Sequence, residues 1–213
     1  MTMRKLLLVV WCLLPAGALA YHYGPGQDAL RVDRAADLVR TAAAAADRAC
    51  AVAAESGDDA ARPHWAEAEK AYGEALELLP AGRLHEIRSA RLERAKARVF
   101  LRELPASRSE LESLVEEIAS DPGESAALLA GARNALANAR YYMTWLLRLE
   151  GATREEWEPE IEGARQTYKL LCEESAAAGD EAGAKEAREN LEATIRLARL
   201  DLSELQGLPL PSQ

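Results

Sequence analysis

The chain of 213 residues is long enough for one domain with a sizeable core, because a single core saturates at about 250 to 300 residues. It contains 44 Ala and 32 Leu but only 7 Val, 4 Ile and 1 Phe. Ala and Leu favour helices, whereas β-branched and aromatic residues favour strands, so the composition predicts an all-α fold and excludes sandwiches, barrels and doubly wound folds. The net charge of −9 makes nucleic acid a poor partner, since an acidic protein repels phosphate backbones.

The N-terminal segment has the pattern of a secretory signal peptide. Arg4 and Lys5 precede the unbroken apolar run 6–14, and Ala18 and Ala20 form an A-x-A cleavage site. The apolar stretch is shorter than the roughly 20 residues that a membrane-spanning helix needs, which favours cleavage over anchoring. We therefore expect an exported protein, periplasmic or secreted, whose signal is cleaved and which would contact a membrane, if at all, only through an uncleaved signal.

These patterns divide the chain into a signal peptide at 1–20, a single helical domain at 21–206 and a flexible tail at 207–213. Loss of Arg4 and Lys5 with the signal lowers the basic count from 26 to 24 against 35 acidic residues, a net charge of about −11. The exported domain is therefore acidic, which disfavours anionic partners.

Glycines, prolines and capping patterns divide the domain into about seven helices. We expect them over residues 28–55, 58–79, 84–103, 109–121, 124–150, 153–178 and 181–205. The short connections make successive helices antiparallel, as in a bundle or a solenoid.

Two of these helix starts carry the sequence pattern of a capping box, in which a Ser or Thr and a Glu three residues later satisfy each other's backbone amides. The pairs are Ser109 with Glu112 and Thr153 with Glu156. Pro159 lies deep in the sixth helix if Thr153 caps it, so this helix either kinks or begins near Glu158.

The segment 68–80 carries the pattern of a known repeat. Its Ala68, Tyr72, Ala75 and Pro80, at steps of 4, 3 and 5, resemble the second-helix signature of the tetratricopeptide repeat (TPR). The sixth helix repeats the first two steps with Ala164, Tyr168 and Leu171. The resemblance implies degenerate helical pairs stacked as a short solenoid, and a non-catalytic interaction module. A plain helical bundle is the alternative, because Ala and aromatic residues also alternate on ordinary packed helices.

The segment 83–108 is basic, with eight Arg or Lys residues and only three Glu. In the rest of the chain acids outnumber bases. The segment is either a solvated helix face paired with acids on neighbouring helices or a docking patch for an acidic partner.

Cys50 and Cys172 are the cysteines left once Cys12 departs with the signal. In an oxidising compartment they either form a disulfide, which needs their Cα atoms within roughly 7 Å, or stay as two buried free thiols. Sequence leaves both alternatives open, because the distance depends on the fold.

The sequence carries no recognised catalytic or cofactor motif. Its three histidines lack the i, i+4 spacing of a helical metal site, and phosphate loops, dinucleotide fingerprints and serine-hydrolase elbows are absent from it. We therefore expect no enzyme, no metal and no cofactor. A hydrolase using the glutamates of 155–162 near Trp145 and Trp157 is a less favoured alternative, since acids at a helix start also complement its dipole.

The fifth predicted helix concentrates residues that suit a binding face. Tyr141, Tyr142 and Trp145 cannot all point to one side of a helix, so at least one should be partly exposed. Tyr, Trp and Arg dominate interface energetics. The candidate partner-binding residues are Asn134, Asn138, Arg140, Tyr141, Tyr142 and Trp145.

We predict an exported TPR-like adaptor that binds a protein or peptide in the cell envelope. The main alternative is a helical bundle that carries a small apolar ligand or lipid. The adaptor predicts a grooved surface with exposed Tyr142 or Trp145, the carrier a closed apolar cavity, and the hydrolase two convergent acids with a raised pKa in one cleft.

Overall fold

A computed structural model describes Trp11 and residues 25–206, and the regular structure within them is all helical, as predicted. The described helices are α2 (Pro25–Ser56), α3 (Asp58–Leu78), α4 (Leu84–Phe100), α5 (Leu104–Ala119), α6 (Ala126–Leu149), α7 (Arg154–Ala178), α8 (Glu181–Arg199) and α9 (Leu202–Gln206). The predicted signal peptide, apart from Trp11, and the predicted tail at 207–213 lie outside the described residues. Among the described helices, none combines the length and apolarity that crossing a bilayer requires.

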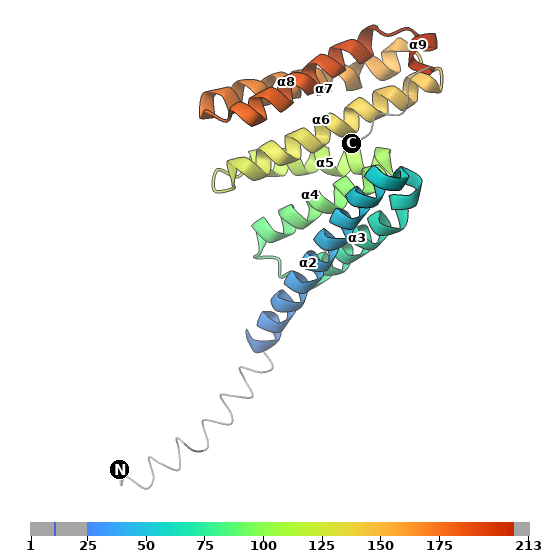
Figure 1. The fold of residues 1–213 in the computed structure, drawn as a ribbon. Helices are drawn as coiled ribbons and strands as arrows, with labels where there is room; N and C mark the ends of the chain where they lie inside the picture. The colour runs from blue at the N-terminus through green and yellow to red at the C-terminus, as the bar shows by residue number, and fades with distance from the viewer. Residues whose placement is uncertain (1–10, 12–24, 207–213) are drawn as a thin grey trace.

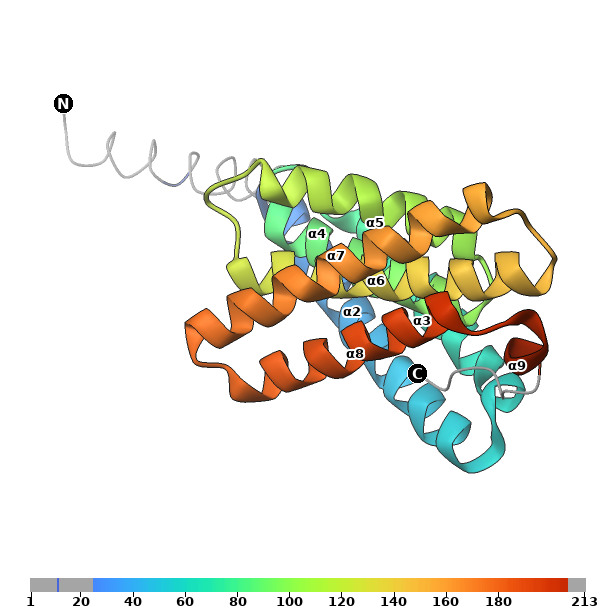
Figure 2. The ribbon, with the colours of Figure 1, turned by 90° about the horizontal axis from the view of Figure 1, so that it is seen from above.

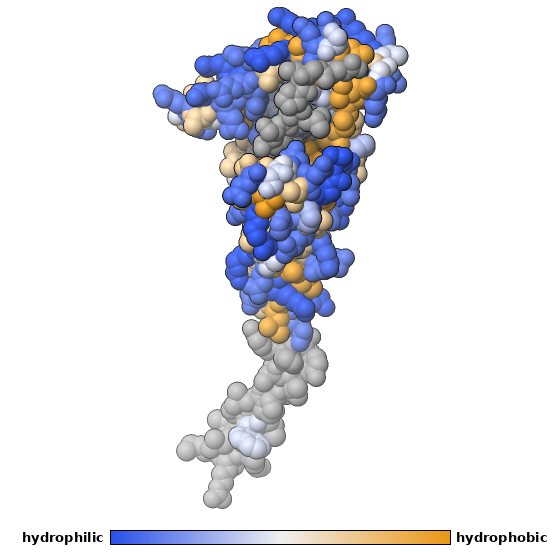
Figure 3. Space-filling view, turned by 45° about the vertical axis from the view of Figure 1, so that its right-hand side comes forward, coloured by the Kyte–Doolittle hydropathy of each residue, from blue (hydrophilic) through white to orange (hydrophobic). Residues whose placement is uncertain are grey.

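The helices stack in sequence order, from α2 and α3 at one end to α7 and α8 at the other (Figure 1). Helices α2 to α8 each pack chiefly against their neighbours within this series, α6 also contacts α4, and α9 packs against α6. Seen from above, the α2–α3 pair runs at an angle to α7 and α8, so the stack turns along its length (Figure 2). Hydrophilic residues cover most of the face shown in Figure 3, and apolar residues gather along one side of its upper, C-terminal part. The architecture is that of an all-α bundle or a short solenoid.

Alanine makes the contact between the first two helices close. Ala42, Ala45 and Ala49 of α2 and Ala61 and Ala68 of α3 are fully buried in one cluster. Because alanine has no side chain beyond Cβ, these residues let the two helices approach each other and lose no rotamer freedom on folding. The small face of α2 leaves room in the same cluster for the aromatic side chains of α3.

The helix after α4 begins earlier than predicted. α5 starts with Pro105 in its first turn, so Ser109 lies inside the helix and its predicted capping box with Glu112 is wrong. Proline suits this position because the first amides of a helix have no acceptor within it.

The last predicted helix is in fact two helices, α8 and α9. Asp201 lies between them, and its Oδ1 accepts the backbone amide of Glu204 at 2.8 Å. The Glu204 carboxylate in turn accepts the backbone amide of Asp201 at 3.0 Å. This reciprocal cap starts a new helix, so the described residues form eight helices where about seven were predicted.

The start of α7 follows the prediction. Thr153 is its N-cap, and the Thr153 backbone amide donates to Glu156 Oε2 at 2.7 Å. The helix continues through Pro159, so the alternative start near Glu158 is wrong. Gly179 ends α7 in the left-handed conformation with a φ of 75°.

All eight basic residues of 83–108 form ion pairs, most of them with acids on other helices, which confirms the paired-face interpretation. The most buried is Arg88, whose guanidinium contacts Glu117 at 2.9 Å, Asp121 at 2.7 Å and Glu124 at 2.9 Å. These acids belong to α5 and to the connection between α5 and α6. One side chain of α4 therefore fixes this connection and the start of α6.

We expect Arg88→Met to lower the melting temperature by roughly 10 °C, because three carboxylates lose their common partner while most of the side-chain volume is kept. Thermal unfolding followed by circular dichroism measures the change. The matched control is Lys70→Met, which removes an exposed pair with Glu74 at 3.8 Å and should change the melting temperature by less than about 2 °C. Equal shifts in the two variants would contradict the role given to Arg88.

Glu124 makes this cluster sensitive to acid. Its pKa is lowered from 4.5 to about 2 by hydrogen bonds with His85, the Ser125 backbone amide and Arg88. Such a carboxylate stabilises the fold above its unfolded pKa, and this contribution is lost as the pH falls through the folded pKa. We therefore expect the urea midpoint of the parent chain to fall as the pH is lowered from about 4.5 to about 2. The fall should be less steep in Glu124→Gln. It should be as steep as in the parent chain in Glu116→Gln, an exposed change outside the cluster. If the urea midpoint of Glu124→Gln fell with pH as steeply as that of the parent chain, Glu124 would not be the source of the acid sensitivity.

Candidate functional site

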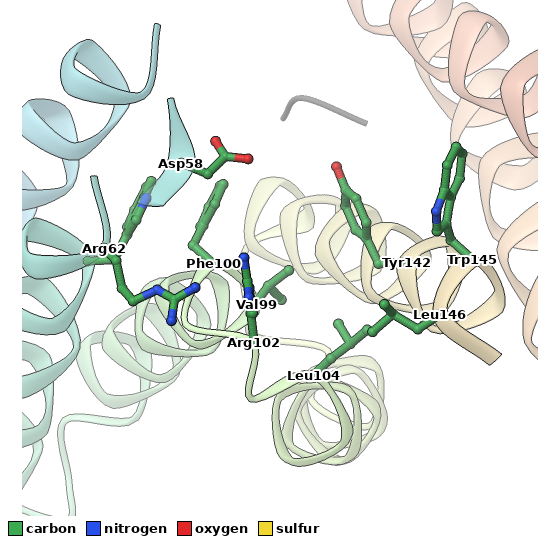
Figure 4. Close-up of a pocket in the computed structure, with 10 residues that line it drawn as sticks. Asp58, Arg62, Val99, Phe100, Arg102, Leu104, Tyr142, Trp145 and Leu146 are labelled. Atoms are coloured by element: carbon green, nitrogen blue, oxygen red, sulfur yellow. The ribbon is translucent and has the colours of Figure 1, made fainter. Parts of the chain in front are cut away.

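A cleft of about 160 Å³ opens between α6 on one side and the start of α3 and the end of α4 on the other (Figure 4). Its α6 wall consists of Tyr142, Trp145 and Leu146, and Trp65 and Phe100 form the opposite wall. We call this the α6 cleft. It lies where α6 passes beside α4, a helix that is not its neighbour in sequence.

Aromatic side chains dominate both walls of the α6 cleft. The rings of Trp65 and Phe100 stack with centroids 3.9 Å apart and planes 1° from parallel. Tyr142 and Trp145 project from the same side of α6 (Figure 4). Leu146 keeps 40% of its surface exposed at the edge. The result is a concave apolar surface with an accessible edge, which suits the binding of apolar groups.

The turn between α4 and α5 shapes the base of the α6 cleft. The Arg102 amide donates to the Val99 carbonyl at 3.0 Å, and the Glu103 amide donates to the Arg98 carbonyl at 3.0 Å. This is the Schellman arrangement, and it gives Arg102 a left-handed φ of 66°, where glycine is the usual residue. Strained backbone of this kind is common at binding and catalytic sites.

The rim of the α6 cleft is charged and exposed. Arg62 and Arg102 both contact Asp59, at 3.1 Å and 3.2 Å. Exposed ion pairs contribute only about 0 to 1 kcal/mol. The two guanidinium groups can therefore turn toward a bound molecule at little cost in stability.

Trp145 belongs to the core as well as to the α6 cleft. It is only 4% exposed and packs in a cluster with Ile161, Leu197 and Leu205. Its indole Nε1 is buried, and no acceptor among the described residues forms a hydrogen bond with it. A buried donor without a partner costs about 1 to 3 kcal/mol, so an occupant that offers a carbonyl would gain additional stability here.

Two of the candidate residues stabilise the fold instead of lining the α6 cleft. Tyr141 packs in the Trp145 cluster with its ring edge against Tyr142, at a centroid distance of 5.7 Å, and burial raises its pKa. Arg140 bridges α5 and α7 through Glu112 at 2.7 Å and Glu160 at 3.9 Å.

Asn134 and Asn138 line a hollow that adjoins the α6 cleft and shares its α4 wall. Asn138 Oδ1 accepts a hydrogen bond from the Tyr168 hydroxyl at 2.7 Å, which fixes the amide. Burial raises the pKa of Tyr168, so the hydroxyl keeps its proton. The structure thus brings four of the six candidate residues, Asn134, Asn138, Tyr142 and Trp145, to one face of α6.

Sequence reasoning missed Leu146 and the opposite wall. Leu146 stands four residues after Tyr142, so helical spacing places the two on the same face and could have identified it. Trp65 and Phe100 carry no such signal, because only the packing of α3 and α4 brings them opposite α6.

Cys50 and Cys172 are free thiols. Cys50 is exposed on α2, and Cys172 is half-buried on α7, with its Sγ 3.6 Å from the Ala184 carbonyl oxygen. A disulfide between them is not formed, because α2 and α7 lie toward opposite ends of the stack (Figure 1). The alternative of two buried thiols also fails for Cys50.

The glutamates at the start of α7 are engaged in caps and ion pairs. Glu156 caps the helix start, and Glu158, Glu160 and Glu162 pair with arginines. Hydrogen bonds from Arg165 and Gln166 lower the pKa of Glu162 to about 2, whereas a general acid needs a raised pKa. Within the described part of the chain, no group of three or more His, Cys, Asp or Glu side chains is placed to hold a metal ion.

Comparison with known proteins gives no match: no family model, no curated protein and no solved structure corresponds to this chain. The chemistry of the α6 cleft therefore carries the functional argument. It combines apolar aromatic walls, a buried donor and an exposed charged rim, which are features of sites that bind a molecule.

We expect Arg102→Gly to raise the free energy of unfolding by about 0.5 to 1 kcal/mol, because relief of the left-handed strain exceeds the entropy cost of glycine. Urea denaturation measures the change. The control is Glu186→Gly at an exposed position within α8. This variant should lower the free energy of unfolding by about 1 kcal/mol. A comparable loss in Arg102→Gly would show that the turn is not strained.

Proposed function

We propose that this protein is an exported, non-catalytic scaffold of TPR-like helical pairs that binds an extended apolar segment of a protein partner in the α6 cleft. The observation that carries the proposal is the buried indole donor of Trp145, which lacks an acceptor among the described residues and belongs to one of the two aromatic walls of the α6 cleft. An extended peptide supplies a backbone carbonyl for the donor and apolar side chains for the walls.

The size of the α6 cleft favours side chains over a whole small molecule. Its volume of about 160 Å³ is below the roughly 300 to 1,000 Å³ of small-molecule sites and close to that of cavities that accept a benzene ring. One or two apolar side chains would fill it. The backbone would then continue over the adjoining hollow of Asn134 and Asn138.

The residues that carry the TPR resemblance support the helical-pair interpretation. Ala68, Tyr72 and Ala75 are all buried on α3. The corresponding residues of α7 are buried as well: Ala164, Tyr168 and Leu171. Small and aromatic side chains thus form the contacts between neighbouring helices, as stacked repeats require.

The signal pattern and the net charge bear on where the protein acts and on what it binds. The signal pattern of residues 1–20 supports export. A net charge of −9 favours a neutral or basic segment over an acidic one, because like charges repel at an interface.

Selection of random peptides displayed on phage against the full chain tests this function. We expect the selected peptides to share closely spaced apolar residues. Leu146→Arg places a charge at the apolar edge of the α6 cleft and should weaken their binding about tenfold or more. The matched control is Leu84→Arg, which changes a leucine that is 48% exposed at the other end of α4 and should leave binding unchanged.

Circular dichroism must show that both variants fold. Equal weakening by Leu146→Arg and Leu84→Arg, or peptides without shared apolar residues, would contradict the proposal. Trp145→Ala is unsuitable because truncating a core tryptophan costs about 3 to 5 kcal/mol. Trp145→Phe keeps a ring in the core while it removes the donor, and it should also weaken binding.

A further inference from the structure

The described chain ends against α6, the helix that forms one wall of the α6 cleft. α9 contacts α6, and its Leu205 is 1% exposed in the same core cluster as Trp145. Arg148 of α6 donates hydrogen bonds to the carbonyls of Leu197 and Leu200, which holds the end of α8 against α6. The last described residue, Gln206, therefore directly follows a residue that packs in the Trp145 cluster.

The segment that follows, residues 207–213, reads Gly-Leu-Pro-Leu-Pro-Ser-Gln and contains no charged side chain. Proline fixes its own φ and restricts the residue before it, so alternating Leu and Pro favour the extended polyproline II conformation. This conformation makes no internal hydrogen bonds, which leaves its carbonyls available as acceptors. It also loses little entropy on binding, and aromatic-lined grooves are its usual docking sites.

The α6 cleft has the features that such a segment needs. Its walls are aromatic, and its buried donor, Trp145 Nε1, faces no acceptor from the described residues. Its volume of about 160 Å³ suits one or two aliphatic side chains. Seven residues in polyproline II span about 20 Å, which sets the reach of this segment from Gln206.

We propose that residues 207–213 of the same chain occupy the α6 cleft, with Leu208 and Leu210 against its aromatic walls and a backbone carbonyl accepting from Trp145 Nε1. This inference rests on the proposed function, because it takes the cleft to be a peptide site, and it adds a means of regulation. A protein partner must displace the chain's own segment before it binds. At a local concentration of about 1 mM, a segment with an intrinsic Kd of about 0.1 mM weakens a competing peptide roughly tenfold.

The indole N–H resonance of Trp145 in the ¹⁵N-labelled full chain tests this proposal, and its loss in Trp145→Phe assigns it. The test variant is the full chain with Leu208→Ser and Leu210→Ser. We expect this double variant to move the Trp145 resonance, and Ser212→Ala, the matched control, to leave it in place. The selected phage peptides should bind the double variant roughly tenfold more tightly than the parent chain, because they no longer compete with the segment.

An unchanged Trp145 resonance in the double variant overturns the proposal. A difference that grows with protein concentration also overturns it, because the segment of a second copy then fills the α6 cleft. The resonance experiment needs no external partner, so its failure leaves the phage selection as a separate test of the cleft.

Discussion

Close contact between alanine-bearing helix faces is the constraint on which this structure depends. More than half of the buried hydrophobic residues of the described chain are alanines, and they dominate the cluster around α2 and α3, so these helices must approach one another closely. Four aromatic residues line the place where α6 passes a helix that is not its neighbour in sequence: Trp65 and Phe100 on one side, Tyr142 and Trp145 on the other. The α6 cleft thus follows from how the helices stack.

Arginine ion pairs and hydrogen bonds fix the relative positions of the helices, which small apolar faces alone do not. An alanine face alone leaves the register of two helices weakly defined. Arg88 ties α4 to the connection before α6, Arg140 links α5 and α7 across α6, and Arg148 holds the end of α8. Buried ion pairs add little net stability, but a shifted register would leave each of these charges without its partner. We infer that they set the position of α6, and with it the geometry of the α6 cleft.

Helix type and the Thr153 cap depend on residues within one turn, which is why composition and spacing predict them. The capping box predicted at Ser109 is wrong because Pro105, one turn earlier, is the stronger signal for a helix start. The burial of Trp145 and the exposure of Leu146 depend on which neighbour covers each face of α6. Spacing along one helix identifies residues that share a face but not the element that covers it, so half of the α6 cleft was beyond sequence reasoning.

Photocrosslinking from the α6 cleft, in the cell that produces the protein, tests the binding function most directly. A photoreactive residue replaces Leu146, which is 40% exposed at the edge of the cleft, or Leu84, which is 48% exposed at the far end of α4. We expect a crosslink to one defined polypeptide from position 146 and none from position 84. Equal crosslinking from both positions, or none from position 146, would contradict a peptide-binding role for the α6 cleft.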